Sequence, residues 1–154
     1  MGYDITLVIH SYLRWAVVIL GVLTVAKAIG GWLGKKPWGA SDDKLGMMFV
    51  SFLDLQLLIG LILFLFLSPI TDTMFQAPGA AMGNRVTRFF SVEHTAFMVI
   101  GLALAHIGRA RARRATDPVA KHRTTAIFMG LGLLVILAGV PWPFLSYGRP
   151  WLRF

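Results

Sequence analysis

Four apolar segments of 20 or more residues, separated by shorter polar ones, dominate the pattern of the chain. They cover about residues 5–29, 46–67, 89–108 and 124–145. About 20 apolar residues are enough for a helix to cross the hydrocarbon core of a bilayer. The pattern therefore predicts four transmembrane helices in a single all-α, integral membrane domain over residues 1–154. Because the helices follow one another through short connections, we expect an up-down four-helix bundle with both termini on one side.

The polar segments predict three connections between these helices. Gly, Pro and charged residues in GGWLGKKPWGASDDK indicate a short loop, and residues 69–88 indicate a longer polar connection. The stretch RARARRATDPVAKHR indicates a basic loop before the last helix, near whose end lie Pro141 and Pro143. The start of the chain, MGYD, lacks the basic residues of a signal peptide, so we expect the first helix to stay in the mature protein.

The composition supports a membrane protein and narrows its chemistry. Charged residues make up 14% of the sequence, whereas a soluble domain has about a quarter. The absence of cysteine excludes disulfides, thiolate-bound zinc and iron–sulfur sites, thiolate-ligated haem and covalently attached c-type haem. Any bound metal is therefore expected to use histidine, methionine or carboxylate ligands.

The net charge of +8 is concentrated at one end of the predicted bundle. The first and third connections carry nine basic residues: Lys35, Lys36, Lys44, Arg109, Arg111, Arg113, Arg114, Lys121 and Arg123. The opposite end carries four: Arg85, Arg88, Arg149 and Arg153. The positive-inside rule therefore places the first and third connections in the cytoplasm and both termini in the periplasm of a bacterial inner membrane. The charge is explained by topology, so no nucleic-acid partner is expected.

Two histidines are predicted at the same depth in the membrane. Ionisable residues inside a span are costly and mark functional sites by default. His10 and His94 each lie about five residues into spans that begin on the same side, roughly 8 Å below the interface. The first and third helices of such a bundle lie on a diagonal, which leaves the space that two imidazoles and an iron need. We predict that both histidines ligate one b-type haem; hydrogen bonds between helices are the alternative.

Three neighbours of these histidines are expected to share the site. Arg14 lies one helical turn after His10 on the same face, where its guanidinium group needs an anion. Glu93 or a haem propionate could supply that anion, and both remain open. Gly101 follows His94 by seven residues and so lies on nearly the same face, where it is expected to leave room for the edge of the porphyrin.

A second polar group is expected toward the cytoplasmic side. His106 and His122 form a candidate pair for a second haem, although a solvated interfacial role is the favoured interpretation of His122 because it lies between Lys121 and Arg123. Asp54 lies inside the second span near Gln56, and a buried carboxylate needs a partner, for which Lys27 and His106 are candidates. An ion pair with Lys27 would be structural. A proton-conducting or quinone-head-group site is the functional interpretation.

Several short pieces of the sequence carry a family resemblance: HSYLRW, RFFSVEH, IGRARARR, AKHR, PWPF and GRPW. They resemble small bacterial four-helix membrane proteins known as cytochrome b or cytochrome b-like, over essentially the whole chain. The resemblance implies a haem-binding membrane protein. Larger respiratory cytochromes b carry a regularly spaced pair of histidines on each of two helices, and His94 and His106 do not repeat that spacing. One haem is therefore expected, with two as the alternative.

The expected function is electron relay between the quinone pool and a redox partner. The short connections leave little surface on which a soluble substrate could dock. We therefore expect membrane lipid, quinone and other membrane redox subunits or further copies of the chain as partners. A haem-free structural or assembly subunit is the main alternative. A transporter or proton channel that uses Asp54, Lys27 and the histidines is a third interpretation.

Overall fold

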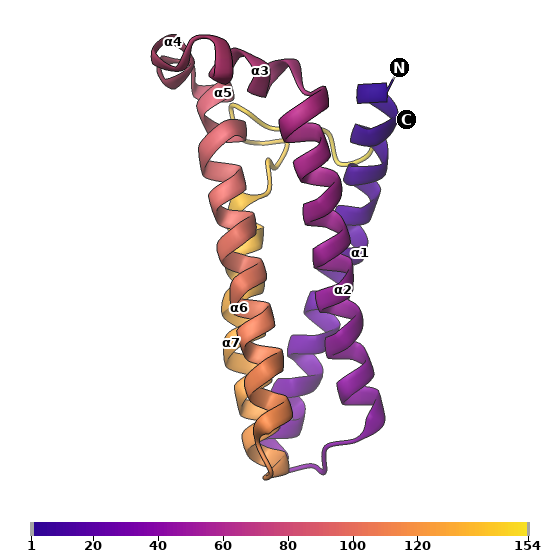
Figure 1. Ribbon diagram of the computed structural model, residues 1–154. Coiled ribbons are helices and arrows are strands. Elements are labelled where there is room, and N and C mark those ends of the chain that lie inside the picture. Colours follow the sequence, from indigo (N-terminus) through magenta and orange to yellow (C-terminus); the bar gives the residue numbers. More distant parts are fainter. Residues whose placement is uncertain (1, 154) are drawn as a thin grey trace.

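The computed structural model describes residues 2–153, and its long helices stand side by side (Figure 1). Within these residues four helical segments are long and apolar enough to cross a membrane, which confirms the predicted all-α architecture. These segments are α1 (Gly2–Leu33), α2 (Ala40–Ile62) with the π-helix η1 (Leu63–Leu67), α5 (Arg85–Arg88) with the π-helix η2 (Phe89–Glu93) and α6 (His94–Arg114), and α7 (Pro118–Gly139). The N- and C-terminal ends lie close together at one end of the bundle (Figure 1).

The predicted basic loop is largely helical. Helix α6 continues to Arg114, which is consistent with the high helix propensity of arginine and alanine. Helix α7 then begins at Pro118, a favoured first residue, and the Asp117 side chain accepts a 2.7 Å hydrogen bond from the Ala120 N–H. Helix α7 ends at Gly139 rather than near residue 145, because Pro141 disfavours a helical conformation of the residue before it.

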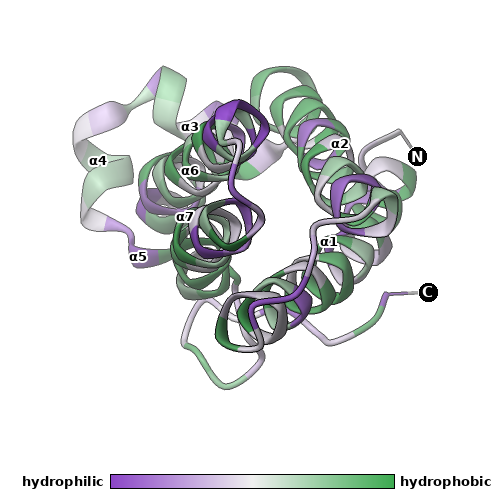
Figure 2. Ribbon diagram, turned by 90° about the horizontal axis from the view of Figure 1, so that it is seen from below, coloured by the Kyte–Doolittle hydropathy of each residue, from purple (hydrophilic) through white to green (hydrophobic). Residues whose placement is uncertain are grey.

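The connection between the second and third spans also folds into short helices. These are α3 (Pro69–Gln76), α4 (Pro78–Gly83) and α5, and the first two begin with proline. The Asn84 side chain caps α5 by accepting 3.0 Å hydrogen bonds from the N–H groups of Val86 and Thr87. Together α3 and α4 lie beside one end of the bundle and leave its interior to the long helices (Figures 1 and 2).

The four long helices pack with unequal tightness. Helix α7 contacts both α6 and α1, and α1 contacts α2, whereas the contact between α2 and α6 is much less extensive. Helices α1 and α6 therefore lie on a diagonal, as the sequence predicts (Figure 2). The loose seam between α2 and α6 leaves space inside one half of the bundle.

Glycines bring α6 and α7 close together. A Cβ atom added to Gly132 would lie 2.8 Å from the Gly101 carbonyl oxygen, and one added to Gly101 would lie 2.5 Å from Ile136 Cγ1. Small residues allow such close approach between membrane helices. Gly101 thus contacts α7 and does not face the diagonal, so the prediction that it leaves room for a porphyrin is wrong.

The outer surface of the bundle is apolar along the long helices. Ile19 is 55% exposed, Leu58 56% and Leu134 64%. A soluble monomer rarely exposes large contiguous apolar areas, so a surface of this kind is expected to contact the hydrocarbon of a membrane. The chain is therefore a multi-pass membrane protein that contacts membrane lipid along these faces.

We predict that Gly101→Ala destabilises the bundle. The new methyl group would collide with Ile136 and with the backbone of Gly132, and overpacking of this kind costs roughly 1–3 kcal/mol. Unfolding in mixed detergent micelles would measure the change. Gly30→Ala is the matched control, because nothing lies within 4 Å of a Cβ atom at that position. Equal stability of the two variants would contradict the tight α6–α7 contact.

Candidate functional site

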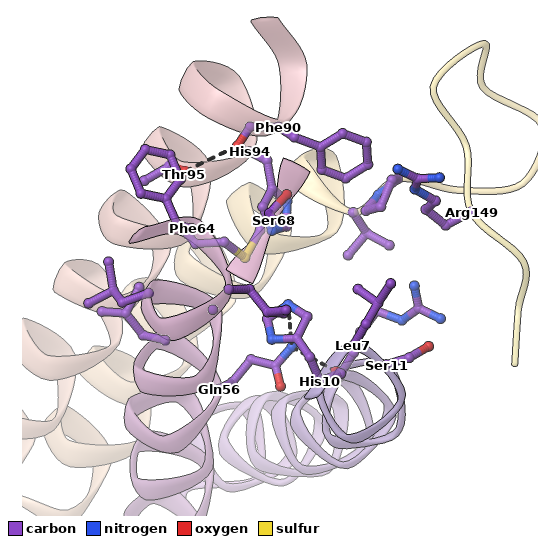
Figure 3. A pocket seen from close by; sticks show the side chains of 18 of the residues that line it. Leu7, His10, Ser11, Gln56, Phe64, Ser68, Phe90, His94, Thr95 and Arg149 are labelled. Carbon is purple, nitrogen blue, oxygen red and sulfur yellow. Dashed lines mark hydrogen bonds between the residues drawn. The ribbon is translucent and has the colours of Figure 1, made fainter. Parts of the chain in front are cut away.

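A cavity of about 150 Å³ lies between α1, α2 and α6 in the half of the bundle that holds the chain termini (Figure 3). The connected free space reaches about 1300 Å³ when its open side is included. Its walls are mainly apolar, as in most ligand sites, and a smaller number of polar residues also line it. These include His10, Gln56, His94 and three arginines, together with the hydroxyl-bearing residues Tyr3, Ser11, Ser68, Thr71 and Thr95.

Both π-helical segments border this cavity. Phe64 in η1 and Phe90 in η2 line it, and the backbone oxygens of both residues accept hydrogen bonds from threonines. Thr71 Oγ1 donates to the Phe64 carbonyl at 2.7 Å, and Thr95 Oγ1 donates to the Phe90 carbonyl at 3.4 Å. Single π-helical turns are rare and occur often at functional sites. No sequence signal pointed to them.

His94 begins α6 directly after η2, and its ring orientation is fixed by α7. His94 Nδ1 lies 2.8 Å from the carbonyl oxygen of Gly139. A carbonyl can only accept, so Nδ1 carries the proton and Nε2 of the neutral ring is left with a free lone pair. Metal-binding histidines have this same arrangement, in which the second ring nitrogen donates to a backbone carbonyl.

His10 contacts α2 on the opposite side of the cavity (Figure 3). The Gln56 amide nitrogen lies 3.2 Å from His10 Nε2 and also donates to the His10 carbonyl at 3.1 Å. His10 Nδ1 and Gln56 Oε1 are buried without a hydrogen-bond partner among the described residues. Gly60 makes room for the ring, since a Cβ atom there would lie 3.1 Å from His10 Cε1. Such unsatisfied atoms cost free energy unless a ligand compensates them.

The two imidazoles face each other across the cavity. Their ring centroids are 6.4 Å apart and their planes are inclined by 71°. The structure therefore brings together the two histidines that the sequence placed at one depth. Within residues 2–153 no group of three or more His, Cys, Asp or Glu side chains is arranged to hold a metal ion. This site could therefore provide a metal ion with two imidazole ligands from the described residues.

Three guanidinium groups, from Arg14, Arg149 and Arg153, border the same cavity. The C-terminal segment is held over it because the Trp151 carbonyl accepts hydrogen bonds from Arg14 Nη2 at 2.8 Å and from Trp15 Nε1 at 2.9 Å. No aspartate or glutamate is among the described residues that line the cavity. Burial and the positive charge of Arg153 lower the pKa of Arg149. The cluster is therefore suited to an anion with more than one negative charge.

Glu93 does not neutralise Arg14. Its carboxylate forms a 2.8 Å ion pair with Arg88 Nε, five residues earlier. The wider turn of η2 brings residues five apart together, which explains this partner. Of the two anions considered for Arg14, Glu93 is therefore excluded, because its carboxylate is paired with Arg88. Arg149 and Arg153 were missed as site residues, and the basic, aromatic ending GRPWLRF is the sequence signal that could have indicated them.

The residues of the second polar group that the sequence predicts, toward the cytoplasmic side, form separate contacts. Asp54 Oδ1 lies 2.8 Å from His106 Nε2, whereas Lys27 pairs with Asp42 at 3.3 Å. Of the two partners considered for Asp54, the structure thus gives His106. Neither Asp54 nor His106 is among the residues that line the cavity of His10 and His94.

His122 is neither solvated nor near His106. It is 2% exposed and packs on the ring of Trp38, with 4.8 Å between centroids. Its Nε2 lies 3.5 Å from the Pro37 carbonyl, and its ring occupies the space where Gly31 lacks a side chain. The solvated interpretation of His122 is wrong. The structure also does not bring together the histidine pair expected for a second haem.

Comparisons with protein-family models, curated proteins and solved structures found no match to this chain.

We predict that Arg153→Gln stabilises the ligand-free protein. The substitution removes the charge that repels both Arg14 and Arg149, and relief of such pairs is worth about 0.5–1 kcal/mol. Unfolding in detergent at low ionic strength would show the gain, and added salt should reduce it because salt screens the repulsion. Arg123→Gln, on the exposed surface of α7, is the control. A loss of stability in Arg153→Gln would contradict the repulsive cluster.

Proposed function

We propose that this chain is a b-type haem membrane cytochrome with one haem between His10 and His94. The supporting observation is the pair of neighbouring imidazoles together with three arginines that have no aspartate or glutamate among the described residues of the cavity lining. A metal ion held by protein alone usually needs about four ligands, whereas haem iron needs only two from the protein. A haem supplies electron transfer when both axial positions are filled.

The spacing of the rings fits this proposal. Two metal–nitrogen bonds of about 2.0 Å, with about 1.1 Å from each nitrogen to its ring centre, separate axial imidazole centroids by roughly 6 Å. The centroids of His10 and His94 are 6.4 Å apart. His94 Nε2 is free to bind because Nδ1 donates to the Gly139 carbonyl, and a hydrogen bond from the other ring nitrogen makes the ligand nitrogen of an imidazole more basic.

The arginines would hold the carboxylate groups of the same ligand. Arg14, Arg149 and Arg153 carry planar guanidinium groups that match carboxylates in bidentate hydrogen bonds. Arg14 Nε is buried without a partner among the described residues, which leaves a donor for such a contact. The C-terminal segment therefore closes the site from the side of the termini.

The proposed role is electron relay between the quinone pool and a redox partner, as part of a larger membrane complex or of a self-associated assembly. The chain would lie in a bacterial inner membrane with both termini in the periplasm, because the other end of the bundle carries most of the basic residues. The haem would then lie in the periplasmic half. The resemblance to small bacterial cytochromes b supports the same assignment.

A haem-free structural subunit is the competing function. The hydrogen bonds from His94 to Gly139 and between Gln56 and His10 each join two helices, which is a sufficient role for an intramembrane histidine. The reduced minus oxidised absorption spectrum of the folded, haem-supplied protein separates the two. A b-type spectrum with about one haem per chain supports the cytochrome, and no haem supports the structural subunit.

We predict that His10→Ala and His94→Ala each lower haem retention by about tenfold or more, because removal of a direct ligand should exceed the effect of removing a supporting residue. A pyridine haemochrome assay on detergent-purified protein would give haem per chain. His106→Ala is the control, since this histidine lies on the same helix as His94 and binds Asp54. Full haem retention in either of the first two variants would refute the axial assignment.

A further inference from the structure

Asp54 of α2 and His106 of α6 form a polar pair on the outer surface of the bundle. Their side chains are joined by a 2.8 Å contact between Oδ1 and Nε2, and each is 50% exposed. The surrounding surface is apolar, with Leu58 56% exposed and Ile107 44% exposed. In a membrane protein such exposure faces hydrocarbon, where ionisable residues are costly and mark function by default.

The pair lies inside the span of α2 and close to the basic end of α6. Asp54 is ten residues beyond Lys44, the nearest charged residue before it on α2, which is about 15 Å along the helix. His106 lies three residues before Arg109, about 5 Å along α6. A carboxylate repels the phosphate of a phospholipid head group, whereas it can accept a hydrogen bond from the hydroxyl group of a neutral molecule dissolved in the hydrocarbon.

The contact between the two residues does not use their full capacity for hydrogen bonds. A carboxylate can accept about four hydrogen bonds and a neutral imidazole can make two. Among the described residues, His106 is the only polar partner of Asp54, and Nδ1 of His106 has none. Hydrocarbon offers no partner for the remaining oxygen and nitrogen. The pair therefore presents unused acceptor and donor groups toward the lipid.

The same seam leads to the histidine cavity. Leu53 and Leu57 of α2, next to Asp54 and one turn beyond it, line that cavity. On α6, Leu102 lines it one helical turn from His106. Helices α2 and α6 are also the most loosely packed neighbours in the bundle. A flat ring held at the pair would thus lie beside the apolar wall of the proposed haem site.

We propose that Asp54 and His106 bind the head group of a lipid-soluble hydroquinone that enters from the bilayer between α2 and α6. A hydroxyl of the ring donates to the Asp54 carboxylate, the imidazole supplies the second polar contact, and the apolar tail stays in lipid. The assignment rests on the proposed exchange with the quinone pool. Binding itself does not require haem, so the two proposals can be tested separately.

The test uses the full chain in lipid nanodiscs with a decyl-substituted benzoquinone, reduced to its hydroquinone, as the probe. Probe retained per chain, relative to empty discs, gives a binding curve. We expect Asp54→Asn and His106→Gln each to weaken binding by about tenfold, the effect of losing a hydrogen bond to a charged group. Asp43→Asn is the control, because Asp43 is a carboxylate in the first turn of the same helix, where it pairs with Arg109, and its substitution should leave probe binding unchanged.

Haem per chain and native mass are measured on the same preparations. Unchanged binding in both Asp54→Asn and His106→Gln overturns the proposal. So does a change in the number of chains per particle without a change in probe binding, which would make this surface a contact between copies. The His94→Ala variant should still bind the probe. If the wild-type protein binds the probe through Asp54 but holds no haem, the proposed function fails and this inference stands.

Discussion

Polar groups within hydrocarbon must find partners inside the chain, and this requirement organises the structure. His94 is paired with the Gly139 carbonyl, Arg14 with the Trp151 carbonyl and Asp54 with His106. Each contact joins segments far apart in the sequence, so each fixes how helices meet. Among the described residues, the buried atoms that remain unpaired in the half of the bundle near the chain termini are concentrated at one cavity, where His10, Arg14 and Gln56 contribute three of them.

The packing of the helices explains why the cavity lies where it does. Gly101 and Gly132 allow α6 and α7 to approach closely, and α7 also packs on α1. The seam between α2 and α6 has no comparable contact. Large side chains such as Phe49 and Met129 fill the bundle core, whereas the half near the termini is bordered by the imidazoles and guanidinium groups. Tight packing between α6 and α7 thus leaves an open space on the side of α2, with mainly apolar walls and a few polar side chains.

The sequence predicts the spans and the facing histidines because both depend on local quantities: the length of apolar segments and the depth of a residue within them. The sequence does not predict the features that depend on the rotation of a helix about its axis or on tertiary contacts. Gly101 does lie on nearly the same helix face as His94, but that face is directed at α7, whose Gly139 carbonyl also binds His94. The π-helical turn gave Glu93 a partner five residues away. Arg149 reaches the cavity through tertiary contacts, because its backbone N–H donates to the Pro141 carbonyl and Trp151, two residues later, is bound to α1.

The two polar groups differ in a way that bears on function. A set of contacts that serves only to join helices should leave few buried groups unsatisfied, because each costs free energy. His94 and its carbonyl meet that expectation. The site as a whole does not, since three arginines border one cavity without a carboxylate among its described lining residues, and the ring opposite His94 keeps an unpaired nitrogen. A dianionic ligand would supply the carboxylates that the guanidinium groups lack, and His94 Nε2 has a lone pair for its metal. The proposed cytochrome therefore accounts for more of these unpaired groups than a haem-free subunit does.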